Sequence, residues 1–166
     1  HRTLHEALEN PVAGWFSHAT PFHFESAYQP ADGIQRFLTG TPPVLSLAAI
    51  EAGVEIVNKA GVETLRERSM KLTEQFVGLF DKQLADLGFK LRSPRQPDLR
   101  GSHISLGHPE ARKITQTLIT KYGVIPDFRV PDNLRIGFAP LYNDETEVEL
   151  AVDAIAKTVI KREFES

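Results

Sequence analysis

The chain of 166 residues contains no cysteine, one methionine and one tryptophan. Without cysteine, this stretch cannot form a disulfide, a thiolate metal site or a cysteine nucleophile, which is compatible with a reducing compartment. It also lacks an excess of one charge, because 19 basic residues face 22 acidic ones, so the composition does not predict nucleic-acid binding. The longest apolar stretch, residues 44–57, contains two glutamates and is too short to span a bilayer.

Common catalytic and metal-binding motifs are also missing. No GxSxG, P-loop or GxGxxG pattern is present. His1 and His5 are four residues apart but have no third ligand nearby, and the other histidines fit no zinc spacing, so we predict no metal site. The chain begins at His1 rather than methionine, and we expect either a processed protein or a piece of a longer one.

Aromatic residues, proline and glycine are concentrated in residues 1–43. This segment holds six of the chain's 14 Phe, Trp and Tyr residues. A free linker would be polar and poor in aromatic residues. We therefore expect an irregular segment of fixed shape that lies against another surface, as a lid over a core or as a functional loop.

Two successive helices are predicted after this segment. Thr41 is a plausible N-cap before Pro42 and Pro43, and residues 44–57 are apolar on nearly every side, which predicts a buried helix. Gly61 interrupts the pattern. Residues 62–87 then carry one apolar stripe, and Gly88 follows in the place of a C-terminal cap. Such a pair of helices is typical of a chain that leaves one domain and enters another.

Beyond Gly88 the pattern predicts short strands and helices in the order strand, strand, helix, strand, strand, helix. The strands are residues 89–91, 102–106, 124–130 and 134–138, and a helix is expected over residues 109–122. Asp144 and Glu147 have the spacing of a capping box that opens the last helix. The predicted fold class is therefore α+β, with a small, mostly antiparallel sheet.

Arg135 is the first candidate for a binding residue. In the strand around it, Leu134, Ile136 and Phe138 point to one face, which turns Arg135 and Gly137 to the other. Gly137 leaves room for a ligand beside the guanidinium, and an arginine fork binds a carboxylate with two parallel hydrogen bonds. The alternative is an edge-strand arginine in water or paired with a surface acid.

Thr41 and Trp15 are the other candidates. Helix N-termini attract anions, but Pro42 and Pro43 remove two N–H donors here, so an anion would depend on Thr41; the alternative is a simple capping threonine. Trp15 offers one indole N–H on a large flat ring. Core packing is the usual role of such a ring, whereas its Gly- and Pro-rich loop allows a position facing a ligand.

Several segments together resemble bacterial kynureninases. They are Gly-Trp-Phe-Ser-His at residues 14–18, Arg-Phe-Leu-Thr-Gly-Thr-Pro-Pro at 36–43, Arg-Gly-Ser-His at 100–103, His-Pro-Glu at 108–110, and Leu-Arg-Ile-Gly-Phe-Ala-Pro-Leu-Tyr at 134–142. The resemblance runs from about residue 14 to the last helix. Kynureninases are fold-type I pyridoxal-phosphate enzymes of the aminotransferase class V branch, and they cleave the Cβ–Cγ bond of kynurenine to give anthranilate and alanine.

The resemblance implies roles for the three candidates. Trp15 and Thr41 would contact the phosphate of pyridoxal 5'-phosphate from the neighbouring subunit of a homodimer, and Arg135 would bind the substrate α-carboxylate. It also implies a cytoplasmic enzyme of tryptophan catabolism and NAD biosynthesis, acting on kynurenine or 3-hydroxykynurenine, with no nucleic-acid or membrane partner.

One departure from the family is large. The family needs a lysine that forms a Schiff base with the cofactor, upstream of the Gly-Trp-Phe segment, and the first lysine here is Lys59. We therefore expect the C-terminal portion of the enzyme: residues 1–61 as the tail of the cofactor-binding large domain, loop plus buried helix, and residues 62–166 as the small α+β domain with its long connecting helix. This portion alone is predicted to be inactive.

Two other interpretations stay open. Another class V enzyme, such as an aminotransferase, would also use a small-domain arginine to bind a carboxylate, whereas the missing cysteine counts against a cysteine desulfurase. The chain could instead be a non-catalytic α+β interaction module derived from such an enzyme. A parent protein about twice as long or more, with a lysine-bearing large domain, would favour the enzyme.

Overall fold

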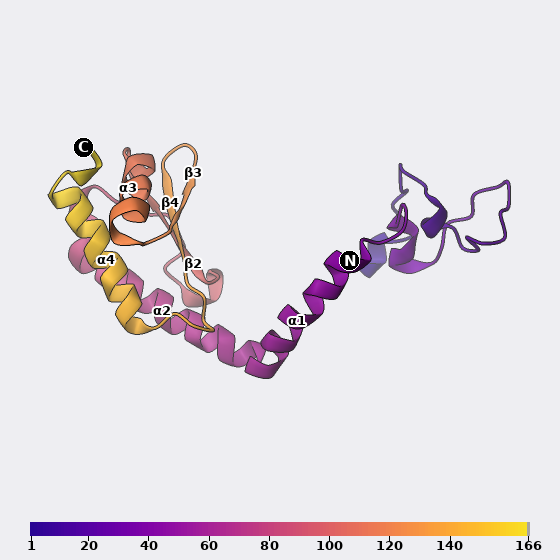
Figure 1. Ribbon diagram of the computed structural model, residues 1–166, viewed down its shortest axis with the longest axis horizontal. Coiled ribbons are helices and arrows are strands. Elements are labelled where there is room, and N and C mark those ends of the chain that lie inside the picture. The colour runs from indigo at the N-terminus through magenta and orange to yellow at the C-terminus, as the bar shows by residue number, and fades with distance from the viewer. Residues whose placement is uncertain (166) are drawn as a thin grey trace. The chain divides into compact units, whose positions relative to one another are not determined.

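The computed structural model describes residues 1–165, which form two compact units (Figure 1). The first unit is His1–Ile56 and the second begins at Val57. Helix α1 (Val44–Ala60) contains the boundary between them.

The first unit is irregular, as predicted for residues 1–43. Three short 3-10 turns, at Arg2–Leu4, Trp15–Ser17 and Gly33–Phe37, are joined by loops. Polar contacts hold the loops together: Arg36 donates from Nη1 to the His5 carbonyl over 2.7 Å, and Asn10 donates from Nδ2 to the Arg36 carbonyl over 3.0 Å. Ser17 is fully buried and bonds both backbone groups of Gly14. The unit is therefore organised by backbone-directed hydrogen bonds.

The helix predicted after residue 43 is present, but the described residues leave it uncovered. Helix α1 has no buried residue, and Leu45 is 88% exposed. An apolar pattern shows only that a helix gains free energy when it is covered. It does not show that the covering residues belong to the same stretch of chain.

Thr41 is not the N-cap of helix α1, so the sequence-based prediction of a capping threonine is wrong. Helix α1 begins at Val44, and its first turn closes with Leu47 N–H donating to the Pro43 carbonyl over 3.0 Å. The reason lies in the two prolines, because a residue that precedes proline is disfavoured in the helical region. Pro42 therefore stays outside the helix, and Thr41 lies further back in the loop.

The second unit contains a four-stranded antiparallel sheet. Its strands are β1 (Lys90–Leu91), β2 (His103–Gly107), β3 (Asp127–Arg129) and β4 (Asn133–Gly137), in the order β1-β2-β4-β3. The strand that carries Arg135 is thus an interior strand, between β2 and β3, so this arginine is not on an edge strand, whereas the alternative of pairing with a surface acid is confirmed by Asp127. The α+β class with a small antiparallel sheet is confirmed.

Three helices pack with this sheet: α2 (Val62–Gln83), α3 (Ala111–Thr117) and α4 (Glu145–Ile160). Helix α4 lies alongside α2 (Figure 1). The capping box is confirmed, because the Asp144 carboxylate accepts the Glu147 N–H over 2.9 Å and Glu147 accepts the Asp144 N–H in return. Gly88 ends the 3-10 turn Ala85–Leu87 that follows α2, and its φ of +86° explains why glycine occupies this position.

The core of the second unit joins one face of the sheet to the helices. On the strands the buried side chains alternate as the sequence pattern predicted, and Ile104, Leu106 and Leu134 are fully buried. Phe76 of α2 meets Phe138 edge to face, with ring centroids 5.6 Å apart. The opposite face of the sheet carries polar side chains and remains partly exposed.

Several predicted elements are shorter in the structure. The helix expected over residues 62–87 ends at Gln83 and is followed by a separate 3-10 turn, Ala85–Leu87, and the strand expected over residues 89–91 is Lys90–Leu91. The helix expected from residue 109 begins at Ala111 and ends as a π-helical turn, Leu118–Tyr122. The extended segment expected over residues 124–130 pairs only at Asp127–Arg129. Within residues 1–165, no helix combines the length and apolarity that crossing a membrane requires.

Candidate functional site

The polar face of the sheet places Arg135 at its centre. In the strand register, Arg135 lies opposite Asp127 on one side and opposite Ser105 on the other. Cross-strand partners point to the same face. The prediction from the period-two pattern that Arg135 points away from the core is therefore confirmed. In the sheet it lies between the carboxylate of Asp127 and the hydroxyl side chain of Ser105.

Arg135 forms an ion pair with Asp127. Its Nη2 lies 2.5 Å from Asp127 Oδ2, and its side chain is 38% exposed. Arg129 shares the same oxygen, with Nε and Nη2 at 2.9 and 2.8 Å. Partial burial works against ionisation, but the hydrogen bonds and charges of the two arginines outweigh it and lower the pKa of Asp127. The carboxylate therefore stays ionised at neutral pH.

An open depression of about 510 Å³ lies beside Arg135. Gly137 lies opposite His103 in the sheet register, and a Cβ built at Gly137 would meet nothing within 4 Å. This confirms that Gly137 leaves space on the face that carries the guanidinium. The depression is lined by Ser102, His103, Arg135, Gly137, Phe138, Ala139, Tyr142 and Asn143.

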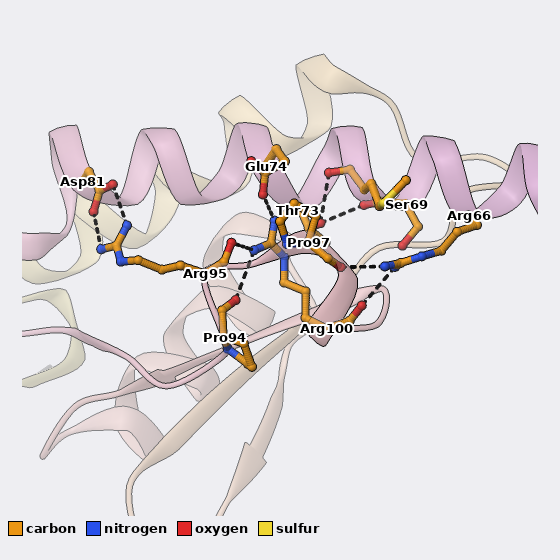
Figure 2. A network of polar contacts seen from close by, with 10 residues as sticks. Arg66, Ser69, Thr73, Glu74, Asp81, Pro94, Arg95, Pro97 and Arg100 are labelled. Atoms are coloured by element: carbon orange, nitrogen blue, oxygen red, sulfur yellow. Dashed lines mark hydrogen bonds and ion pairs between the residues drawn. The ribbon is translucent and has the colours of Figure 1, made fainter.

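A network of polar contacts joins the loop before β2 to helix α2 (Figure 2). The Arg100 side chain is 2% exposed and pairs with Glu74 of α2, while its Nη1 donates to the carbonyls of Pro94 and Arg95. Burial lowers the pKa of Arg100, and the nearby charge of Arg66 lowers it further. These contacts tie the loop to α2, immediately before Ser102 and His103.

Further contacts complete this connection. Arg66 of α2 donates to the Arg100 carbonyl over 2.9 Å, and the hydroxyls of Ser69 and Ser102 lie 2.5 Å apart. The Phe138 N–H donates to the Ser102 carbonyl over 2.8 Å, which joins the loop to the end of β4. Residues 100–103, which belong to the family resemblance, thus serve here to fix the wall beside Arg135.

Trp15 and Thr41 lie in the first unit. Trp15 opens a 3-10 turn, is 47% exposed, and meets Phe16 and Phe22 edge to face at 4.4 and 5.6 Å between ring centroids. It borders a hollow of about 480 Å³. Thr41 is exposed in the loop before α1. Neither residue is buried in a core, so both side chains are accessible within this unit.

Gly14 brings the Trp15 turn against the loop that leads to Thr41. A Cβ at Gly14 would lie 1.6 Å from the Thr39 carbonyl oxygen, a distance that only glycine avoids. The two cofactor candidates therefore belong to neighbouring segments of one unit. Arg135 belongs to the other unit.

The donors of the first unit suit an anionic group. An indole N–H and a threonine hydroxyl both donate hydrogen bonds, as a phosphate requires. All eight lysines of the chain are exposed, so none has the desolvated surroundings that activate a lysine amine for covalent chemistry. Within the part of the chain that the structure describes, no group of three or more acidic or histidine side chains is arranged to hold a metal ion.

Asp127 is the residue of this site that the sequence reasoning missed. It lay in a segment predicted only as extended. The available signal was the pair of short strands around the turn at residues 130–132. Pairing them as a hairpin would have brought an acid of the first strand beside Arg135 of the second.

Solved structures define the class of fold. The apo structure of the cysteine desulfurase from Thermococcus onnurineus NA1 matches 96% of this chain with a TM-score of 0.74 and 16% identity, over 41% of its own length. A NifS-like protein matches 77% of this chain, with a TM-score of 0.59 and 19% identity, over 37% of its length. The chain therefore has an α+β fold also present in these proteins; at this identity the likeness concerns the fold alone.

Sequence comparison identifies the family. The model of the kynureninase C-terminal domain matches residues 65–155. Kynureninase of Pseudomonas fluorescens is 38% identical over 96% of this chain and 38% of its own length, and that of Burkholderia mallei (strain SAVP1) is 39% identical over 90% and 36%. The chain belongs to the kynureninase C-terminal domain family. It spans less than two fifths of the length of these curated relatives.

Proposed function

We propose that this chain is the C-terminal portion of a pyridoxal-phosphate-dependent kynureninase. The complete protein, meaning this chain with the further length that its relatives have, would hydrolyse L-kynurenine or 3-hydroxykynurenine. The products would be anthranilate or 3-hydroxyanthranilate, together with L-alanine. The observation that carries the proposal is the 38% identity to a kynureninase over 96% of the chain.

Arg135 would bind the α-carboxylate of the substrate. It lies on the open polar face of the sheet, it is partly exposed, and the depression beside it has room next to Gly137. A guanidinium and a carboxylate form paired, charge-assisted hydrogen bonds that fix orientation as well as affinity. Held in this way, the amino acid end of the substrate would have one defined direction relative to its ketone.

Trp15 and Thr41 would hold the phosphate of the cofactor, across the subunit interface of a homodimer. The indole N–H and the hydroxyl are both accessible in the first unit. Once bound, the cofactor would supply the electron sink for cleavage of the Cβ–Cγ bond. In the balanced reaction, water adds its hydroxyl to the ketone carbon, which becomes the carboxylate of the aromatic product, and the alanine carbon gains a proton.

The chain alone would supply only part of this site. Residues 1–61 would be the tail of the large domain and residues 62–166 the small domain, with the reactive lysine in the part that precedes Trp15 in the family. The exposed lysines of this chain are unsuited to that role. We therefore expect no anthranilate from residues 1–166 by themselves.

The test is an assay of the complete protein, loaded with pyridoxal phosphate, for anthranilate released from kynurenine. Arg135→Ala is expected to lower kcat/KM about 30-fold, or about 2 kcal/mol, because truncating one partner of a charge-assisted pair costs at least that much. Arg112→Ala, which removes an exposed arginine of α3, is the matched control and should leave kcat/KM unchanged.

Other outcomes would favour the alternatives. Amino transfer to a 2-oxo acid without anthranilate would indicate an aminotransferase of the same class. Failure of the complete protein to retain pyridoxal phosphate would favour a non-catalytic module. If Arg135→Ala and Arg112→Ala had the same kcat/KM as the unaltered protein, Arg135 would have no place in the site.

A further inference from the structure

Asp127 and Arg135 form a fixed pair at the centre of the polar face. They are direct cross-strand partners in β3 and β4, and their side chains meet at 2.5 Å between Oδ2 and Nη2. Arg129 contacts the same carboxylate oxygen through Nε and Nη2. One carboxylate thus receives two guanidinium groups, one from its own strand and one from the strand beside it.

The ion pair with Asp127 uses only some of the N–H groups of the Arg135 guanidinium. Within residues 1–165 the hydrogen bond recorded for its side chain is the one from Nη2 to Asp127, and a guanidinium has five N–H groups. On the flank away from Asp127 stands Ser105, whose short side chain bonds Asn133 at 3.3 Å. The remaining N–H groups of Arg135 are therefore available toward the depression beside Gly137.

The net charge of the side chains around Arg135 also favours the binding of one anion. Asp127 carries one negative charge against the positive charges of Arg129 and Arg135, so the three side chains together are singly positive. A monocarboxylate that binds Arg135 would make the group neutral. A substrate carboxylate therefore has no need to displace Asp127 in order to bind.

We propose that Asp127 is a positioning residue: it holds Arg135 by one edge of the guanidinium, so that the opposite edge is presented to the α-carboxylate of the substrate. The proposal rests on the proposed function for the identity of the substrate, but it applies to any α-amino acid bound at this face. A long arginine side chain without such a partner would sample many rotamers, and binding would have to order it. The carboxylate of Asp127 removes that requirement before the substrate arrives.

The first test compares kinetic constants of three variants of the complete protein with kynurenine. Asp127→Ala is expected to raise KM about tenfold with kcat changed less than about threefold, because the carboxylate is bound alike in the ground and transition states. Asp127→Asn keeps an acceptor oxygen and should restore part of the loss. Arg112→Ala, at an exposed position of α3, is the control and should leave KM within about twofold.

A second measurement separates this proposal from the reaction itself. L-Alanine and L-alaninamide differ in the α-carboxylate, and their Kd values can be measured on the loaded protein without turnover. The unaltered protein should prefer L-alanine, and Asp127→Ala should lose most of that preference, whereas a loss of general stability would weaken both ligands alike. In the Arg135→Ala background, Asp127→Ala should cause no further loss.

The outcomes are distinguishable. If the protein does not release anthranilate but prefers L-alanine in an Asp127-dependent way, the proposed reaction is wrong and the positioning role stands. If Asp127→Ala keeps the preference for L-alanine, or binds L-alanine more tightly, then Asp127 does not position Arg135 or competes with the ligand, and the proposal is overturned. If the alanine variant does not fold, Asp127→Asn, which is nearly isosteric, provides the test with a smaller expected loss of the preference for L-alanine.

Discussion

At Gly14 the backbone of the Trp15 turn passes so close to residue 39 that no side chain fits between them. A Cβ added at Gly14 would first meet backbone atoms of Thr39, which cannot move aside as the end of a flexible side chain would. The turn is closed by Ser17, which is buried and also accepts the Tyr28 hydroxyl over 2.9 Å. The position of the indole therefore depends on one residue having no side chain.

Gly14→Ala is expected to displace the Trp15 turn and to reduce the cofactor occupancy of the complete protein after dialysis. Gly40→Ala is the matched control, because a Cβ there meets nothing within 4 Å. Absorbance of bound pyridoxal phosphate provides the measurement. Equal occupancy in the two variants would show that the turn does not place a cofactor ligand.

At the scale of single elements, helix α4 shows how a local signal supports the site. Its capping box joins Asp144 to Glu147, and Glu147 also accepts a hydrogen bond from Asn143 Nδ2 over 2.9 Å. Asn143 in turn accepts the Ala139 N–H over 2.7 Å and lines the depression beside Arg135. The start of the helix is thus connected to the loop that follows β4.

Asp144→Ala should lower the free energy of unfolding by about 1 kcal/mol, the usual cost of losing an N-cap acceptor. Thr146→Ala, at an exposed position of the same first turn, should change it by less than about 0.5 kcal/mol. Urea denaturation of the 166-residue chain followed by circular dichroism measures both values. Equal losses for the two variants would contradict a specific role for the cap.

At the scale of the whole molecule, the two units differ in how they are held together. The second unit has a continuous apolar core, in which Phe76, Leu84 and Ile155 have no exposed surface. In the described residues 1–60, Ala31 is the one buried apolar side chain, and hydrogen bonds of Arg36 and Ser17 connect the loops. Cooperative folding requires a continuous apolar core like that of the second unit, and hydrogen bonds between loops do not replace it.

Residues 61–166 are therefore expected to unfold alone in a single cooperative transition. Its midpoint should lie within about 4 °C of the corresponding transition in residues 1–166, since a domain of this size shifts by about that much per kcal/mol. Residues 1–60 alone should show no such transition. Thermal unfolding followed by circular dichroism makes the comparison, and a non-cooperative loss of helix in residues 61–166 would contradict it.

Much of the fold of the second unit could be predicted from local signals. The alternation of Leu134 and Ile136, the stripe of α2, and the capping box of α4 each depend on residues close in the chain, so the α+β class followed from them. The same alternation predicted that the Arg135 side chain lies on the face of the sheet opposite the core. The roles of Trp15 and Thr41 came from resemblance and stay predictions.

The sequence by itself determined which faces are apolar, the order and approximate positions of the helices and strands, and which family the chain resembles, because these depend on neighbouring residues. Tertiary structure alone decided that β4 is an interior strand, that Asp127 holds Arg135, and that Gly14 adjoins Thr39. It also showed that α1 is left uncovered by the described residues. These are contacts between distant positions, and a pattern that records only periodicity and spacing does not specify which distant partner a side chain meets.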